Sequence, residues 1–278
     1  MGQIIGHKTL KPSRLLKISG SIALTTFLLL LMPAAKLPKK TINQVKTIVL
    51  DAGHGGSDPG CNGANEIWEK EVTLDVVLKV GKLITEQLPD VKVLYTRTTD
   101  KALKLSDRPN YANKQDADLF ISVHCNANND SRAKGSETYF MGLHKEEGNL
   151  NVAKRENSAI TFETDYQNND LYGGFDPNSP ESHIIFSLVQ NAYLNQSLRL
   201  SSYVEEETSK LTSIRSRGVK QAGFLVLWKT SMPSILIETG FLTNHDDRNY
   251  LKTEEGQWNV ANGILNAVVR YKKHIEKK

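Results

Sequence analysis

The chain has 278 residues, of which 39% are hydrophobic and 24% are charged, and this balance is ordinary for a globular protein. Its formal net charge is only +4, and the sequence has no basic stripe interleaved with aromatic residues, so a nucleic-acid partner is not indicated. Two cysteines are too few for a disulfide framework, and we predict that Cys61 and Cys125 are free thiols.

The N-terminal residues 1–36 predict a signal peptide or an N-terminal anchor. An uncharged run at 18–32 is followed by small residues and is preceded by four basic residues, Lys8, Lys11, Arg14 and Lys17. We therefore expect export to the periplasm or cell envelope, with membrane contact only through this segment. The polar residues 37–44 are expected to be a linker, and 45–278 a single domain.

The apolar run 47–50 predicts a strand that is covered on both faces, as in a parallel sheet. Asp51 ends this run, and His54 follows among glycines. Such glycines let the backbone turn sharply and leave the imidazole of His54 open at the carboxyl end of the strand, where open α/β sheets place their ligands. Residues 57–65 are rich in turn formers and predict a loop.

The elements that follow alternate between helix and strand. Apolar spacing predicts a helix from about Glu69, a strand at 91–95, a helix capped by Ser106, and a strand at 119–124 that ends in His124. This order predicts an α/β fold, a single domain with a twisted, mostly parallel sheet and helices on both faces.

The second half of the chain continues this alternation, with one interruption. We expect a strand at 137–141, a helix at 149–160, a long helix from 182 towards 209, strands at 224–228 and 234–238, and a closing helix at 254–274. The stretch from 163 to about 182 is rich in Asn, Asp, Gly and Pro, which predicts an inserted surface segment.

Three side chains have the chemistry of a metal site. Zinc in hydrolases is commonly held by two histidines and a carboxylate at about 2.0–2.2 Å, with the fourth position left to water. His54, Glu69 and His124 supply that set, and each lies where a strand ends or a helix begins. The pattern alone leaves alternatives open: either histidine could be structural, and Glu66 or Glu71 could replace Glu69.

Glu238 follows an apolar strand directly, and an acid there is costly to bury unless it is paired or functional. If Glu69 binds the metal, Glu238 remains available as a general base.

Five segments, taken in order, resemble the zinc-dependent N-acetylmuramoyl-L-alanine amidases of bacterial cell-wall turnover. They are residues 48–60, 69–74, 105–108, 120–127 and 237–244. The resemblance implies one zinc ion held by His54, Glu69 and His124, and it selects this glutamate over its neighbours. It also implies that Glu238 is the catalytic carboxylate and that the substrate is peptidoglycan. The implied reaction is hydrolysis, through a zinc-bound water, of the amide between N-acetylmuramic acid and the L-alanine of the stem peptide.

The chain departs from the family pattern at Ala52 and Cys125, where relatives often have proline and alanine. We expect Cys125 to pack away from the metal, because adjacent strand residues point to opposite faces. Asn126 and Arg217 are candidates for substrate binding; a structural turn is the alternative for each.

Some relatives carry a regulatory segment that covers the metal, and the insert at 163–182 falls at the corresponding place. Glu181 or His183 could then reach the open metal position, which leaves room for an activator protein that lifts the segment. Two other functions remain open: a zinc peptidase that acts within the stem peptide, and a non-catalytic peptidoglycan-binding module.

Overall fold

The computed structural model describes residues 2, 42–64, 67–144, 146–163, 172–176, 179, 181–182, 184 and 193–277. The predicted signal or anchor segment, most of the predicted linker, Glu66 and His183 therefore lie outside the described residues. Within the described ranges, no helix combines the length and the apolar character that crossing a membrane requires.

A six-stranded sheet forms the centre of the domain, with the strand order β4-β1-β5-β8-β6-β7. Neighbouring strands run parallel, except that β6 is antiparallel to β8. The prediction of a mostly parallel sheet is confirmed. The bounds are β1 (Thr47–Ala52), β4 (Lys92–Tyr95), β5 (Leu119–Asn126), β6 (Ser136–Met141), β7 (Ser216–Ala222) and β8 (Ser234–Phe241).

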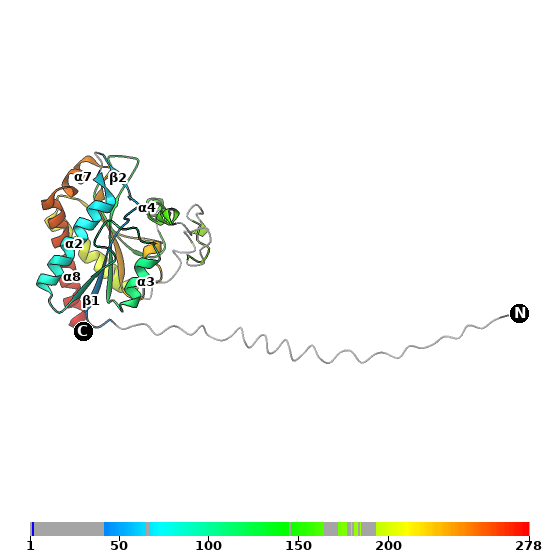
Figure 1. Ribbon diagram of the computed structural model, residues 1–278, viewed down its shortest axis with the longest axis horizontal. Helices are drawn as coiled ribbons and strands as arrows, with labels where there is room; N and C mark the ends of the chain where they lie inside the picture. Colours follow the sequence, from blue (N-terminus) through cyan, green and yellow to red (C-terminus); the bar gives the residue numbers. More distant parts are fainter. Residues whose placement is uncertain are drawn as a thin grey trace. The chain divides into compact units, whose positions relative to one another are not determined.

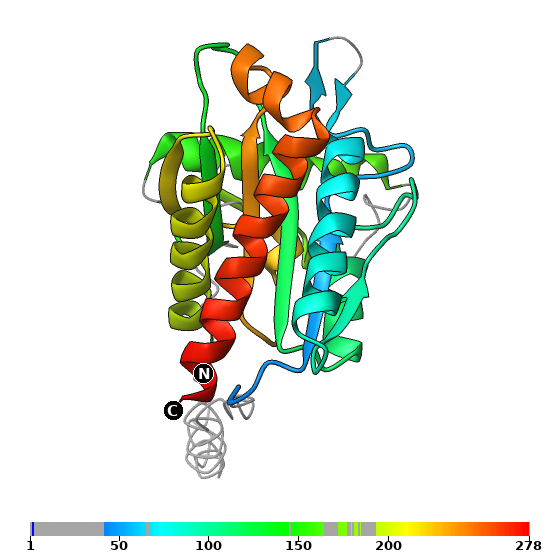
Figure 2. The ribbon, with the colours of Figure 1, turned by 90° about the vertical axis from the view of Figure 1, so that its left-hand side faces the viewer.

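Helices cover both faces of this sheet (Figure 1). Figure 2 shows three long helices side by side in front of one face, α2 (Glu69–Gln87), α8 (Glu254–Glu276) and α6 (Leu194–Leu211). The opposite face is covered by α3 (Asp107–Lys114), α4 (Glu147–Asn157) and the 3-10 helices η1 (Ser158–Phe162) and η4 (Leu225–Leu227).

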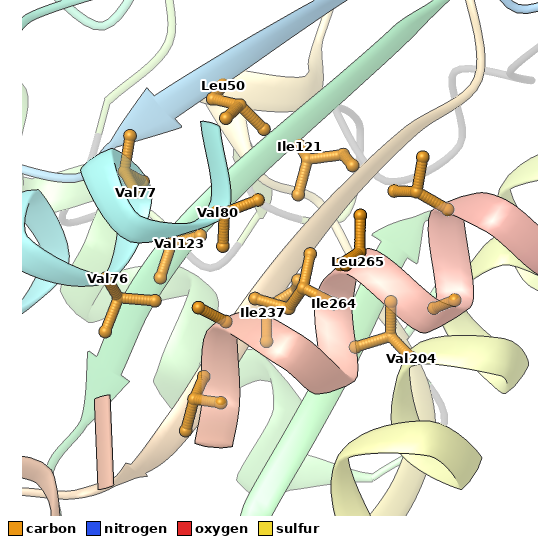
Figure 3. Close-up of a cluster of buried hydrophobic side chains, with 14 of the residues drawn as sticks. Leu50, Val76, Val77, Val80, Ile121, Val123, Val204, Ile237, Ile264 and Leu265 are labelled. Carbon is orange, nitrogen blue, oxygen red and sulfur yellow. The ribbon is translucent and has the colours of Figure 1, made fainter. Parts of the chain in front are cut away.

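The hydrophobic core between the sheet and the three long helices is the larger of two apolar clusters. In Figure 3, β-branched and leucine side chains from the sheet meet those of α2, α6 and α8. Burial of each such side chain stabilises the fold by about 1.5–3 kcal/mol. The labelled members are Leu50, Val76, Val77, Val80, Ile121, Val123, Val204, Ile237, Ile264 and Leu265.

In the second half of the chain, one predicted strand is wrong and one strand was not predicted. Residues 224–228 form no strand, because Leu225–Leu227 fold as η4 and bury all three side chains. A short apolar run does not distinguish a buried strand from another buried segment. The strand that was not predicted is β7, which contains Arg217, so this residue does not lie in a turn. The polar, half-exposed residues of β7 suit the edge of a sheet.

Three short elements were not predicted. They are the hairpin strands β2 (Asn62–Gly63) and β3 (Ile67–Trp68), which interrupt the expected loop, and α7 (His245–Leu251). The helix expected from 182 is described only from Leu194 onwards, as α6.

The strands β1, β5 and β8 are parallel neighbours, so their carboxyl ends meet at one edge of the sheet. His54 follows β1, His124 lies near the end of β5, and Glu238 is paired in register with His124 on β8. The first residue of α2 is Glu69. The topology therefore brings the candidate residues to the same place.

Candidate metal centre

Four buried side chains converge at the carboxyl edge of the sheet: His54, Glu69, His124 and Glu156. One potential ligand atom from each lies within 4.8 Å of the others. The carboxylate Oε1 of Glu69 is 3.1 Å from His54 Nε2 and 3.1 Å from His124 Nδ1. The three groups singled out in the sequence thus lie together, and a fourth joins them.

His54 is held in a left-handed backbone conformation, with φ of 59°, directly after β1. Its ring nitrogen Nδ1 lies 2.7 Å from the carboxylate of Asp58, which leaves Nε2 facing the other three groups. Arg108 donates a hydrogen bond to the carbonyl oxygen of His54 at 2.8 Å and pairs with the buried Asp51 at 2.8 Å. A carboxylate behind a ligand histidine fixes the ring orientation, as is usual in metal sites.

Glu69 is fully buried at the amino terminus of α2, and backbone amides hold its carboxylate. The amide of Cys61 donates to Oε2 at 2.8 Å, and that of Cys125 donates to Oε1 at 2.9 Å. Two such bonds fix the direction of the group. Burial raises the pKa of Glu69, but the attraction of His54 and the hydrogen bonds from both imidazoles together lower it below its ordinary value.

His124 packs directly against the backbone of Gly53. A Cβ atom at that position would lie only 2.5 Å from His124 Cε1, which is too close for two carbon atoms. The glycine is therefore needed to let the imidazole turn its Nδ1 toward Glu69.

We expect Gly53→Ala to displace the His124 ring, to weaken metal binding at least about tenfold and to destabilise the fold by about 1–3 kcal/mol. Metal titration and urea unfolding measure the two effects. Gly148→Ala on α4 is the matched control, because no atom lies within 4 Å of its Cβ position. Unchanged metal affinity in Gly53→Ala would contradict this role for Gly53.

Glu156 was not among the predicted site residues. Its Oε2 lies 3.1 Å from His54 Nε2 and 2.9 Å from His124 Nδ1, and the side chain is 3% exposed. A signal was present in the predicted helix at 149–160, because Glu156 shares helical spacing with the apolar Val152 and Ala153. An acid on the buried face of a helix needs a partner.

The electrostatics of the cluster fit a divalent cation. Burial opposes charge on both imidazoles, yet Glu69 raises the pKa of His54 well above its ordinary value. Glu156 likewise raises the pKa of His124 to about 9 against the effect of burial. The buried carboxylates of Glu69 and Glu156 thus favour a positive charge between them.

Two atoms of the cluster lack hydrogen bonds among the described residues. They are His54 Nε2 and Glu156 Oε2, which face each other without hydrogen-bond geometry. Imidazole nitrogens and carboxylate oxygens are the donors that zinc and similar metals accept, so the residues fit such an ion.

The cysteines are not part of this set. Both are free, as predicted, and burial raises the pKa of each thiol well above its ordinary value, so neither is a thiolate. Cys125 Sγ lies 3.3 Å from the hydroxyl of Thr239 and belongs to the core beneath α2 and α8, which confirms that it packs away from the cluster.

Glu238 is completely buried beside the metal cluster. Its Oε1 lies 3.2 Å from a guanidinium nitrogen of Arg155, and its Oε2 has no hydrogen-bond partner among the residues described. Burial, reinforced by the negative charge of Glu156, raises the pKa of Glu238 well above its ordinary value. The carboxyl group is thus poised to exchange a proton in a site from which water is largely excluded.

The remaining candidates lie at different distances from the cluster. Asn126 is buried next to it, and its Oδ1 accepts a hydrogen bond from Arg155 at 3.0 Å. Arg217 lies on β7, where its guanidinium pairs with Glu137 and stacks over the ring of Phe241. Glu181 is exposed and accepts a hydrogen bond from Ser179, so the fourth place at the cluster is taken by Glu156 and not by Glu181.

A cavity of about 130 Å³ opens onto the cluster. It is lined on one side by His54, Cys61 and Glu69, and on the other by Arg155, Glu156 and Phe162 of α4 and η1. Access to the candidate metal centre is therefore bounded by the segment that also supplies its fourth side chain, Glu156.

Comparison with known proteins places this site in a family. Residues 48–270 match the family model described as N-acetylmuramoyl-L-alanine amidase. The amidase AmiC of Escherichia coli is 34% identical over 227 residues, which are 81% of this chain and 52% of AmiC. The amidase AmiA of Salmonella typhimurium is 30% identical over 241 residues, which are 85% of this chain and 80% of AmiA.

Solved structures agree with the sequence matches. A crystal structure of an N-acetylmuramoyl-L-alanine amidase from Clostridium difficile superposes with a TM-score of 0.61 at 27% identity, covering 82% of this chain and 97% of that one. The catalytic domain of CwlV, an amidase from Paenibacillus polymyxa, gives 0.60 at 26% identity, covering 82% and 98%. The chain spans about half the length of AmiC, so the match concerns a shared domain. Because the family model covers most of the chain and the fold agrees, this protein belongs to the N-acetylmuramoyl-L-alanine amidase family.

Proposed function

We propose that the chain is a zinc-dependent peptidoglycan amidase that cleaves the amide between N-acetylmuramic acid and the L-alanine of the stem peptide. The observation that carries this proposal is the buried set of His54, Glu69 and His124 beside Glu238, in the fold of an amidase family. One zinc ion per chain would be held by these two imidazoles and one carboxylate.

The chemistry needs a nucleophile and a proton carrier. A zinc ion bound by His54, Glu69 and His124 would supply a Lewis acid and would lower the pKa of a water molecule to about 7. Glu238 accepts a proton from the attacking water and delivers it to the amide nitrogen. The C–N bond breaks, the hydroxyl group remains on the acyl carbon and the hydrogen goes to the amine of L-alanine, so one water molecule is consumed.

The position of Glu156 indicates that this structure is a closed form. Catalytic zinc sites keep one position open, whereas four protein ligands are typical of structural sites. His54, Glu69, His124 and Glu156 together provide four. We therefore infer that α4 restrains the enzyme and that hydrolysis requires Glu156 to leave. An activator protein that draws α4 away would have this effect, and the insert at 163–182 directly follows α4 and η1.

Digestion of purified peptidoglycan by an opened variant, Glu156→Ala, tests the proposed reaction. Mass spectrometry should find complete stem peptides freed from glycan. Shortened peptides would indicate a zinc peptidase, and unchanged muropeptides would indicate a binding module; either result would refute the amidase.

Metal dependence is a separate prediction. We expect about one zinc per chain by elemental analysis, loss of turnover after chelation and recovery when zinc is returned. His124→Ala should lower the zinc content, whereas His245→Ala, at an exposed position at the start of α7, should not. A chelated protein that retains full turnover would contradict a metal mechanism.

The substrate sets the place of action. Peptidoglycan lies outside the cytoplasmic membrane, so we propose export to the periplasm or cell envelope, with residues 1–36 as the signal peptide or anchor.

A further inference from the structure

The guanidinium group of Arg155 fills a set of three oxygen acceptors beside the metal cluster. One terminal nitrogen donates to Asn126 Oδ1 at 3.0 Å and to the carbonyl oxygen of Ala127 at 2.8 Å. The other donates to Glu238 Oε1 at 3.2 Å and also lies 2.8 Å from Oε1 of the neighbouring Glu156. The three acceptors outside α4 come from β5, from the residue after it and from β8, so they belong to the edge of the sheet and stay in place if α4 moves.

The orientation of the Asn126 side-chain amide is fixed by Glu137, on the side away from Arg155. Its Nδ2 donates to Glu137 Oε2 at 3.0 Å, and the same oxygen accepts a hydrogen bond from Tyr139 at 2.6 Å. The carboxylate of Glu137 also pairs with Lys220 at 3.0 Å and with Arg217. Because a carboxylate accepts from its amino group, the buried amide presents its oxygen toward the site.

Three oxygen acceptors that face one point favour a nitrogen that carries several hydrogens. A partly exposed arginine, at 28%, is its occupant in the closed form. In the proposed reaction, one atom of the substrate acquires this chemistry: the scissile nitrogen, which begins with a single N–H and leaves as the amine of L-alanine. That nitrogen must also reach Glu238 to receive its proton, and Glu238 Oε1 is one of the three acceptors.

We propose that Asn126 Oδ1, the carbonyl oxygen of Ala127 and Glu238 Oε1 form the subsite for the leaving amine, and that Arg155 occupies this subsite as a substitute for the substrate. This inference rests on the proposed function and adds a role for the main chain of Ala127 and for Asn126. Both bind the amine as it gains hydrogens, which favours the departing form over the planar amide. Arg155 and Glu156 then block two different places, the leaving-group position and the metal.

Calorimetry with two synthetic probes tests the subsite in the zinc-loaded, full-length protein. The probes are L-alanyl-γ-D-glutamate with a free amine and the same dipeptide with an N-acetyl group. In the double variant Arg155→Ala/Glu156→Ala we expect the free amine to bind at least about tenfold more tightly, because hydrogen bonds made by a charged group are stronger than those made by a neutral amide. Wild type should bind both probes weakly, since Arg155 fills the subsite.

Adding Asn126→Ala to this double variant should reduce the preference for the free amine about tenfold, whereas adding Asn110→Ala, on the exposed surface of α3, should leave it intact. Asn126→Ser is a second variant in case alanine does not fold. Equal binding of the two probes by the double variant would contradict the proposed subsite. A preference that neither Asn126 variant alters would also overturn it, because the amine would then be binding elsewhere, for example to zinc.

Muropeptide cleavage by the same preparations separates this inference from the proposed function. Cleavage without a preference for the free amine would refute the subsite and leave the amidase intact. A preference that depends on Asn126, without cleavage, would support the amine site and refute the amidase.

Discussion

E238Q is expected to reduce kcat by about 10²–10⁴-fold, the usual contribution of a general acid or base, while zinc content and folding stay unchanged. Glutamine has the shape of glutamate but cannot carry the proton from water to the leaving nitrogen. The amide oxygen of glutamine can still accept the hydrogen bond that Glu238 Oε1 accepts from Arg155, and Oε2 makes none among the described residues, so the change removes little structural support. Steady-state kinetics in the opened background, with elemental analysis and circular dichroism, measure the three quantities.

Glu205→Gln provides a matched control for E238Q. Glu205 is another buried carboxyl group, on α6, where it accepts hydrogen bonds from Thr138 at 2.6 Å and Ser136 at 3.2 Å. Burial raises its pKa above the ordinary value, as it does for Glu238, but Glu205 is not part of the cluster of His54, Glu69, His124 and Glu156. We expect kcat to remain within about twofold of the opened background. Turnover of E238Q at the level of this control would rule out Glu238 as the proton carrier.

Glu156→Ala is expected to raise the rate of peptidoglycan hydrolysis about 10- to 100-fold, with zinc retained. The closed form loses the contacts of Glu156 with His54 and His124, at 3.1 and 2.9 Å. Interactions of a charged group are worth about 1.5–3 kcal/mol, which shifts an equilibrium between closed and open forms by that factor. Three ligands remain to hold the metal. Release of soluble peptide from labelled peptidoglycan measures the rate.

Glu147→Ala is the control for this variant, because Glu147 is an exposed acid in the first turn of the same helix. It should leave the rate unchanged. If Glu156→Ala were as inactive as E238Q, Glu156 would be a required part of the catalytic site and not a restraint. Deleting 163–182 separately should show whether the insert contributes to the restraint or α4 acts alone.

Local patterns in the sequence predict the parts of the site that lie at the ends of elements. The apolar run before Asp51 and the glycines around His54 predict a strand that stops at a ligand, and the run before Glu238 predicts a buried acid. Glu69 could be chosen over its neighbours only through the family resemblance. In the structure its side chain is fully buried while that of Glu71 is exposed, which a helix amino terminus does not reveal by itself.

The same local patterns fail where a polar segment, and not an apolar one, occupies a position in the sheet. The residues 224–227 are apolar enough for a central strand, yet the sheet position beside β6 is taken by the more polar β7. Pairing at a sheet edge needs backbone hydrogen bonds more than apolar side chains, so burial patterns cannot choose between them.

The sequence by itself determined the mostly parallel α/β fold, because short-range periodicity predicts its strands and helices. It also placed His54, His124 and Glu238 together, because parallel strands end at the same edge of a sheet. Five segments in order identified the family. Only the tertiary structure decided what covers these three residues. Glu156 and Arg155 are separated from His54 by about a hundred residues, and helical spacing shows that Glu156 faces inward without showing what it meets. That contact is set by the docking of α4 over the carboxyl edge of the sheet, a long-range packing event that no local pattern encodes.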